Sequence, residues 1–240
     1  MEPENIIEVS EDESFCFACN SKVPCFNECC GDLNQFLTPY DILRLKNHFS
    51  ISSTRFLDQY TTRHMGPQTG LPVITLKPAD PSTLKCPFVT SQGCSVYDNR
   101  PSSCRMYPVI RVLSRSRETG KTKIRYALLK EPHCRGFEEK RRITVREWME
   151  NQGLLPYNEM NDMMMDIISL KNRLMPGPLM GEAEQLFFTL CYDIDRLKEA
   201  TFKTEHHVIE ISDAVKSNDA DLLRFGMAYL RDKVFGQKDG

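Results

Sequence analysis

Residues 16–30 read CFACNSKVPCFNECC and hold five of the ten cysteines of this 240-residue chain. The other five are Cys86, Cys94, Cys104, Cys134 and Cys191, so nine of the ten lie within the first 134 residues. This usage is higher than in ordinary proteins, yet lower than in small disulfide-stapled scaffolds. Because clustered thiolates repel one another unless a cation holds them, the pattern predicts a metal-binding domain.

The spacing of the cysteines indicates how the ligands are shared. The two-residue gap between Cys16 and Cys19 would let both sulfurs reach one ion. Cys29 and Cys30 are adjacent, and consecutive side chains diverge in an extended segment. We therefore expect these two to serve different metal centres, or different irons of one cluster. Whether Cys19 is a ligand stays open, and the eight predicted ligands are Cys16, Cys25, Cys29, Cys30, Cys86, Cys94, Cys104 and Cys134.

Eight thiolates fit two four-coordinate sites, or one iron–sulfur cluster and a second site. A ligand set this rich in sulfur favours zinc, iron or an iron–sulfur cluster over magnesium, calcium or manganese. The alternative, that the cysteines are small buried hydrophobes, fits Cys191, which shares an apolar helical face with Phe187 and Leu190. The acidic N-terminus lacks the basic and apolar regions of a signal peptide, so we expect a cytoplasmic protein without disulfides.

Charge and hydropathy narrow the class of partner. The formal net charge is −2, which disfavours nucleic acid, and no apolar run is long enough to cross a membrane. Between Arg100 and Arg146, however, fourteen Lys or Arg accompany four Glu. These cations could offset the charge of the thiolates, or bind a protein or a small anionic substrate. We expect Arg100 and Arg105 to lie beside the metal and to hydrogen-bond a thiolate or pair with Asp98, although the Arg-Pro turn could instead only shape the loop.

The local patterns around the cysteines predict an α+β fold. Thr38 and Pro39 open a helix, and Ser52 or Ser53 caps a second short one. Residues 73–76 are predicted as a short strand, and residues 109–116 and 122–130 as a β-hairpin turning at 118–121. Thr144 and Glu147 form a capping box that starts another helix.

We expect three segments along the chain. Residues 1–14 carry six acidic residues and no basic one, which predicts a flexible N-terminus. Residues 15–155 form an irregular cysteine-rich metal-binding domain with short helices and the β-hairpin. Residues 156–240 form a helical extension, with helices expected over about 158–175, 181–200, 208–216 and 219–235, the last capped by Ser217 or Asn218.

Residues 93–105, GCSVYDNRPSSCR, resemble the CxxYxxRPxxCR signature of a cysteine-cluster (CxxCxxCC-type) zinc- or iron-chelating domain family. The likeness extends over about residues 15–155. It is carried further by Phe15-Cys16, Cys25 through Cys30, the helix start at Leu37–Leu45, Cys86-Pro87-Phe88, Cys134 through Phe137 and Thr144 through Glu147. The first cysteines are more widely spaced here than in the family pattern, which leaves open which two of Cys16, Cys19 and Cys25 correspond to it.

The resemblance implies zinc or iron chelation through the cysteines. One branch of the family is associated with lysine N-methylation of flagellin. That association implies, as an alternative, a metal-dependent enzyme that methylates protein lysines with S-adenosylmethionine. The sequence has no glycine-rich strand-to-helix turn of the kind that binds this cofactor in a Rossmann fold.

Overall fold

The computed structural model describes residues 5–115, 122–199 and 201–236. Contacts divide the chain into two compact units, each built from two segments. The first unit comprises Met1–Leu33 and Pro78–Asn158, and the second comprises Asn34–Lys77 and Glu159–Gly240. We had expected consecutive segments divided near residue 155. The division differs because the helices that follow Thr38 pack against helices near the C-terminus.

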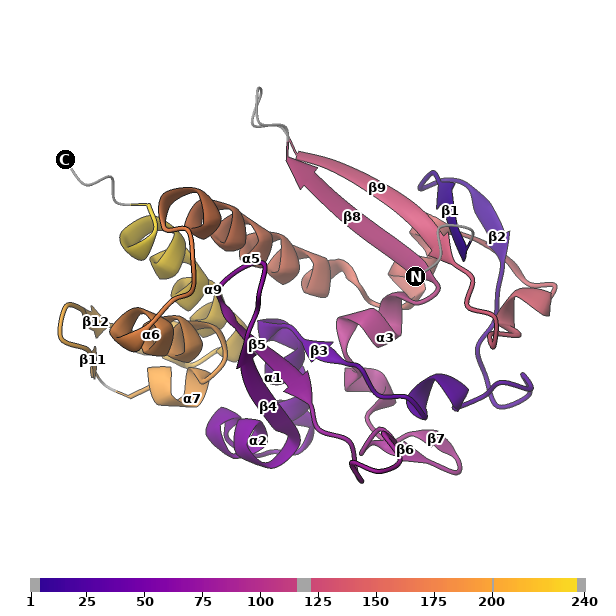
Figure 1. The fold of residues 1–240 in the computed structure, drawn as a ribbon, viewed down its shortest axis with the longest axis horizontal. Coiled ribbons are helices and arrows are strands. Elements are labelled where there is room, and N and C mark those ends of the chain that lie inside the picture. Colours follow the sequence, from indigo (N-terminus) through magenta and orange to yellow (C-terminus); the bar gives the residue numbers. More distant parts are fainter. Residues whose placement is uncertain (1–4, 116–121, 200, 237–240) are drawn as a thin grey trace. The chain divides into compact units, whose positions relative to one another are not determined.

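The first unit consists of small antiparallel sheets joined by short helices (Figure 1). A three-stranded sheet has the order β1-β9-β8, and two further pairs are β2 with β10 and β6 with β7. Its strands are β1 (Ile6–Val9), β2 (Ser14–Cys16), β6 (Val89–Thr90), β7 (Gly93–Cys94), β8 (Val109–Arg115), β9 (Thr122–Leu129) and β10 (Arg142–Thr144). Its helices are the 3-10 helices η2 (Glu28–Cys30), η3 (Tyr97–Asn99) and η4 (Gly136–Glu138), with α3 (Ser102–Met106), α4 (Val145–Asn151) and the start of α5 (Leu155–Leu174).

The predicted hairpin is confirmed, since β8 and β9 pair antiparallel from Val109–Leu128 to Arg115–Thr122. Its predicted turn lies outside the described residues. The N-terminal segment differs from our expectation of a flexible tail, because β1 pairs with β9, with Ile6 opposite Leu129. The free edge of β9 offers unpaired backbone groups, and these can order a neighbouring segment whatever its charge.

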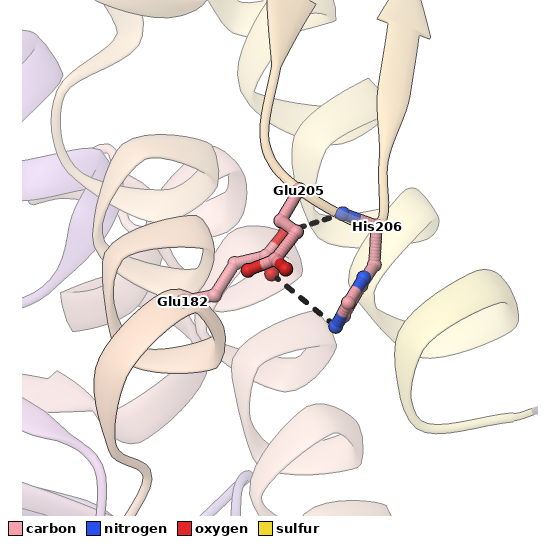
Figure 2. Close-up of side chains that lie close together, drawn as sticks. All are labelled: Glu182, Glu205 and His206. Atoms are coloured by element: carbon pink, nitrogen blue, oxygen red, sulfur yellow. Dashed lines mark hydrogen bonds and ion pairs between the residues drawn. The ribbon is translucent and has the colours of Figure 1, made fainter.

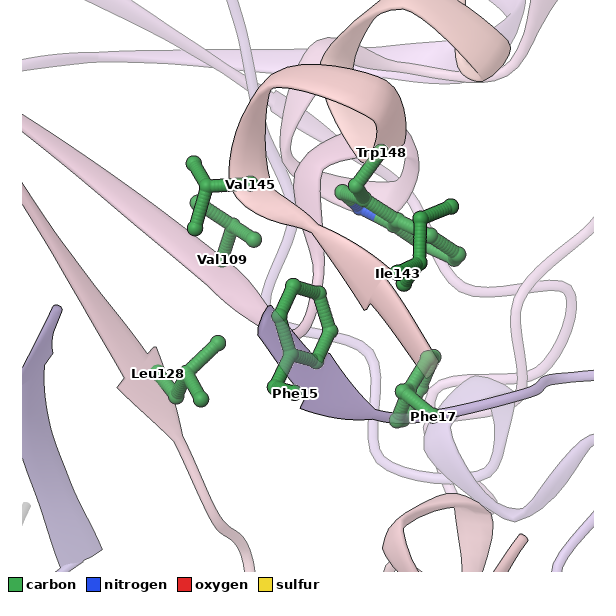
Figure 3. Close-up of a cluster of buried hydrophobic side chains, with 7 residues drawn as sticks. All are labelled: Phe15, Phe17, Val109, Leu128, Ile143, Val145 and Trp148. Atoms are coloured by element: carbon green, nitrogen blue, oxygen red, sulfur yellow. The ribbon is translucent and has the colours of Figure 1, made fainter. Parts of the chain in front are cut away.

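The core of the first unit lies between the strand β2, the hairpin and the helix α4 (Figure 3). The indole of Trp148 meets the ring of Phe17 edge to face, with centroids 5.3 Å apart, and its Nε1 donates a hydrogen bond to the Met106 carbonyl. The buried members are Phe15, Phe17, Val109, Leu128, Ile143, Val145 and Trp148. This core gives the cysteine-bearing loops a fixed base.

A close contact at Gly136 joins this core to the loop of Cys134. A Cβ added at Gly136 would lie 2.5 Å from Cε2 of Phe17 and 2.7 Å from the carbonyl oxygen of Ala18. We therefore expect Gly136→Ala to lower the free energy of unfolding by about 1–3 kcal/mol, as overpacking does. Urea unfolding followed by the fluorescence of Trp148 would measure it. Gly31→Ala is the control, because its nearest contact is 3.2 Å, and equal losses in both variants would contradict the argument.

The second unit combines a small sheet, ordered β3-β5-β4, with a set of helices and the strand pair β11–β12. Its strands are β3 (Phe36–Leu37), β4 (Thr61–Met65), β5 (Pro72–Leu76), β11 (Thr201–Lys203) and β12 (Val208–Glu210). Its helices are α1 (Pro39–His48), α2 (Ser53–Tyr60), most of α5, α6 (Gly181–Cys191), α7 (Ile194–Leu197), α8 (Asp213–Lys216), α9 (Asp219–Tyr229) and the π-helical turn η5 (Leu230–Val234). No helix among the described residues is both long and apolar enough to cross a membrane.

The predicted caps are confirmed at each helix start that the patterns indicated. Thr38 and Asp41 form a capping box at α1, and Ser52 caps α2. Thr144 and Glu147 form the capping box of α4, and Asn218 caps α9. The predicted α+β class is therefore confirmed, with helices and strands present in both units.

Two of the expected C-terminal helices were wrong in their extent. The helix expected over 181–200 ends at Cys191 and resumes at Ile194, because the carboxylate of Asp193 accepts hydrogen bonds from the hydroxyls of Ser53 and Thr54, both at 2.8 Å. The helix expected over 208–216 begins instead as β12, in which Ile209 is buried between exposed neighbours. A strand partner, β11, was available for this β-branched stretch, and only a short helix, α8, follows it.

Candidate metal centre

Two loops that are far apart in the sequence meet in the first unit. The amide of Cys86 donates to the carbonyl of Cys30 at 2.9 Å, and the side-chain amide of Asn27 donates to the carbonyl of Thr90 at 3.1 Å. These two bonds bring the N-terminal cysteine loop and the Cys86–Cys104 segment together. Hydrogen bonds to main-chain carbonyls thus hold the two loops together, and they place cysteines from both loops near one another.

Electrostatic coupling identifies which thiols lie close enough to influence one another. Burial and the neighbouring thiols of Cys29, Cys25 and Cys134 raise the pKa of Cys19 to about 11. The pKa of Cys30 is raised by its hydrogen bond with Cys29, by burial, and by the charges of Cys29, Cys86 and Cys104. We call the coupled thiols the cysteine cluster, and its members are Cys19, Cys25, Cys29, Cys30, Cys86, Cys94, Cys104 and Cys134.

Seven of the eight predicted ligands lie in this cluster, and the ten cysteines are all present as thiols and not as disulfides. Cys16 takes a different position. It lies in β2 opposite Arg142, between the buried rings of Phe15 and Phe17 in sequence, so strand alternation turns it to the opposite face from the core. Cys19, which the sequence left open, lies beyond the end of this strand and couples to Cys29, Cys25 and Cys134.

Cys29 and Cys30 do not diverge, so the premise that they lie in an extended segment was wrong. They belong to the 3-10 helix η2, and their sulfurs are 3.9 Å apart. This separation matches two ligands of one tetrahedral ion, whose sulfurs lie about 3.5–4 Å apart at ordinary metal–sulfur bond lengths. The hydrogen bond from Cys30, opposed by burial and assisted by His133, lowers the pKa of Cys29 to about 7.

The remaining sulfurs are less tightly grouped. Within the described part of the chain, three or more donor atoms of His, Cys, Asp or Glu fall within 4.8 Å of one another only at Glu182, Glu205 and His206, in the second unit. The thiols of the cysteine cluster therefore couple through space without forming a closed tetrahedral set. Neutral thiols gain little from mutual contact, whereas a cation would draw the thiolates together.

Backbone amides point at several of these sulfurs. The amide of Arg135 donates to Sγ of Cys25 at 3.1 Å. Cys86 accepts from the amides of Phe88 and Val89, Cys94 from Val96, and Cys134 from Gly136, and each of these bonds lowers the pKa of the thiol against the effect of burial. Amide donors stabilise a thiolate over a thiol, and they are a recurring feature around metal-bound sulfur.

Besides the amide donors, the hydroxyl of Tyr107 also bears on whether a metal fits among these cysteines. It is buried without a hydrogen-bond partner of normal geometry and lies against the Cys134 thiol. A buried hydroxyl without a partner is costly. This cost falls when Cys134 is a thiolate, because the phenolic hydroxyl then donates a strong, charge-assisted hydrogen bond to the sulfur. The sulfur donors and their surroundings therefore fit a bound thiophilic cation.

Arg100 and Arg105 border the cluster in different ways. The positive charge of Arg100 lowers the pKa of Cys19 and of Cys94, in both cases against burial. Arg105 donates to the backbone carbonyls of Arg100, Gln152 and Asp98, so its contact with residue 98 is to the main chain. Arg105 thus holds the Cys94–Cys104 loop against the end of α4.

Two residues outside the predicted ligand set also have clear positions. His133 lies near Cys29 and 3.7 Å from Glu131, with its side chain about two-fifths exposed. Cys191 is fully buried in α6 of the second unit, where burial raises the pKa of its thiol. Cys191 is therefore a core residue apart from the cysteine cluster, as the sequence predicted.

Comparison with known families identifies the segment that carries the cysteine cluster. Residues 18–135 match the model of the CxxCxxCC family, described as a "Putative zinc- or iron-chelating domain". This segment is a CxxCxxCC domain. The match begins just before Cys19 and ends just after Cys134, so it spans every member of the cysteine cluster and leaves Cys16 outside. The description names metal chelation and no reaction, and it gives no support to S-adenosylmethionine as a cofactor. No curated protein and no solved structure gave a significant match to the chain.

Proposed function

We propose that the CxxCxxCC domain of this protein binds zinc or iron, the latter alone or as an iron–sulfur cluster, through thiolates of the cysteine cluster. The observation that carries the proposal is the convergence of eight thiols from loops more than fifty residues apart in one unit. The donors are all sulfur, which favours zinc and iron over magnesium or calcium. Free thiols in this number are maintained in a reducing compartment, so we also propose a cytoplasmic location.

The raised pKa values support a role for a bound cation. Cys19, Cys30, Cys86, Cys94 and Cys134 hold their protons more tightly than an ordinary thiol, because burial and neighbouring sulfurs penalise the thiolate. Cys29, with a pKa of about 7, is the thiol that most readily supplies the first ligand. Binding of a cation would then displace protons from the others, with a matching rise in affinity as the pH increases.

Anaerobic purification tests the proposal directly. Elemental analysis is expected to find zinc or iron retained through gel filtration, and acid-labile sulfide with a brown colour would identify an iron–sulfur cluster. X-ray absorption at the metal edge should show sulfur neighbours at about 2.3 Å for zinc. Protein that is free of metal and has titratable thiols at all cysteines would contradict the proposal.

A matched pair of variants separates Cys19 from Cys16. We expect Cys19→Ser to lower the bound metal by at least about tenfold at a fixed chelator concentration, because a thiolate ligand is lost. Cys16→Ser should retain the wild-type metal content, since alternation along β2 places Cys16 on the face opposite the buried Phe15 and Phe17. Competition with a chromogenic chelator measures both. Loss of metal from Cys16→Ser with full retention in Cys19→Ser would reverse this assignment.

A further inference from the structure

The second unit brings together a separate group of metal-ligating side chains. Glu182 lies in the first turn of α6, and Glu205 and His206 lie in the turn between β11 and β12 (Figure 2). One donor atom from each residue lies within 4.8 Å of the other two. The group is built of two carboxylates and an imidazole, and therefore differs in chemistry from the all-sulfur cysteine cluster.

Glu182 is held in place by the turn that faces it. Its Oε1 accepts a hydrogen bond from the backbone amide of His206 at 2.8 Å, and its carboxylate also accepts from the side chain of Thr204. The turn is fixed in its own right, because the amide of Thr204 donates to the His207 carbonyl at 2.8 Å and the Thr204 hydroxyl accepts from the His207 amide. These bonds fix the position of Glu182, as partners of a ligating carboxylate do.

The second carboxylate oxygen of Glu182 accepts no hydrogen bond and faces the imidazole of His206. Its Oε2 makes no hydrogen bond and lies 3.7 Å from His206 Nε2, a distance at which the two form an ion pair when the imidazole is protonated. Figure 2 shows the imidazole of His206 and the carboxylate of Glu205 beside the carboxylate of Glu182. Two carboxylates and one imidazole, with donor atoms within 4.8 Å of one another, supply the oxygen and nitrogen ligands that one cation would hold together.

The neighbouring histidine does not compete for this position. Nδ1 of His207 lies 3.1 Å from the hydroxyl of Tyr229, and the two rings meet edge to face. His206, in contrast, is largely exposed and keeps Nε2 available to a ligand. Adjacent residues of one turn thus have different roles, one anchoring the turn to α9 and the other facing the carboxylates.

We propose that Glu182, Glu205 and His206 form a second metal site, which takes a zinc ion through two carboxylate oxygens and Nε2 of His206. Imidazole and carboxylate together suit zinc, and imidazole is poorly matched to magnesium or calcium. Three protein ligands leave one tetrahedral position for water, so the ion would stay open to solvent. Such a site would bind zinc more weakly than the cysteine cluster binds its metal, and its zinc would exchange faster. It would also tie the β11–β12 turn to the start of α6.

Isothermal titration calorimetry of the 240-residue chain with Zn²⁺ tests this site, after the cysteine cluster has been loaded with its metal. We expect one additional zinc per chain, absent in His206→Ala and weakened by at least about tenfold in Glu182→Gln, as loss of a ligand predicts. His64→Ala, at an exposed histidine in β4, is the matched control and should bind as wild type does. NMR of the imidazole signals should show zinc shifting His206.

Several outcomes would overturn the proposal. No additional zinc in the wild type, or unchanged binding in His206→Ala, would leave His206 and Glu182 as an ion pair only. The test is independent of the proposed function of the first unit. If the cysteine cluster holds no metal, the weaker event should still appear and still depend on His206, whereas failure here leaves the thiolate-bound metal unaffected.

Discussion

Removal of metal from the cysteine cluster is expected to unfold the first unit, and Cys94→Ala should have the same effect. Structural zinc contributes about 10–16 kcal/mol of apparent binding free energy in small zinc-finger peptides at neutral pH. The loops that carry Cys25, Cys94 and Cys104 contain short 3-10 and helical turns and a two-residue strand pair. Such elements have little stability of their own. The fluorescence of Trp148, the chain's one tryptophan, reports on this unit, and a strong chelator should shift it to the unfolded value.

Cys191→Ala is the matched control for this experiment. Cys191 is buried in α6 of the second unit, so its replacement should cost only core packing, about 1 kcal/mol, with no change in metal content. The chelator should also have little further effect on Cys94→Ala, because the two changes act on the same bound ion. Equal destabilisation by Cys94→Ala and Cys191→Ala would remove the distinction between ligand and core cysteines.

In the second unit, Lys46→Met should cause the largest loss of stability, about 3–5 kcal/mol, because one partner of a buried ion pair is removed and the other is left behind. Lys46 is 4 % exposed and contacts two carboxylates, Asp195 Oδ2 at 3.0 Å and Asp219 Oδ2 at 2.7 Å. Lys198 alone would then face both acids. Urea unfolding followed by far-ultraviolet circular dichroism would measure the loss. Lys203→Met, at an exposed lysine in β11, is the control.

The same network gives the pH dependence that should accompany this loss. The pKa values of Asp195 and Asp219 lie below the ordinary value, since hydrogen bonds and the charges of Lys46 and Lys198 outweigh the opposing effect of burial. A depressed carboxylate pKa stabilises the fold above the unfolded value of about 4, and this contribution is lost as the pH falls through the folded values. Lys46→Met should therefore lose less stability than the wild type on acidification from pH 5 to 3. A parallel decline in both proteins would contradict this account.

Cysteine clustering and helix caps could be predicted from the sequence because their causes are local. The capping boxes at Thr38 and Thr144 need only a hydroxyl and a carboxylate three residues apart. The β-hairpin follows from β-branched and apolar residues on both sides of a turn. The metal-binding domain could also be predicted from local sequence. Cysteines at such short spacing provide several sulfur donors within reach of one ion.

Long-range contacts decided what local spacing left open. Spacing alone made Cys16 and Cys19 equally suitable ligands. In the structure, alternation along β2 places Cys16 on the face opposite Phe15 and Phe17, whereas Cys19 couples to Cys25 and Cys29. The 3-10 turn at Glu28–Cys30 brought the sulfurs of Cys29 and Cys30 to 3.9 Å, against the expectation of divergence.

By itself the sequence determined the type of chemistry, an α+β chain with a sulfur-rich metal-binding domain and a buried, separate Cys191. The tertiary structure alone decided which thiols couple, how residues 34–77 join the C-terminal helices in one unit, and that Glu182 meets His206. The physical reason is range. Residue type and spacing fix bonds across a few positions, whereas the position of a side chain relative to a distant loop depends on which apolar faces and strand edges pack together.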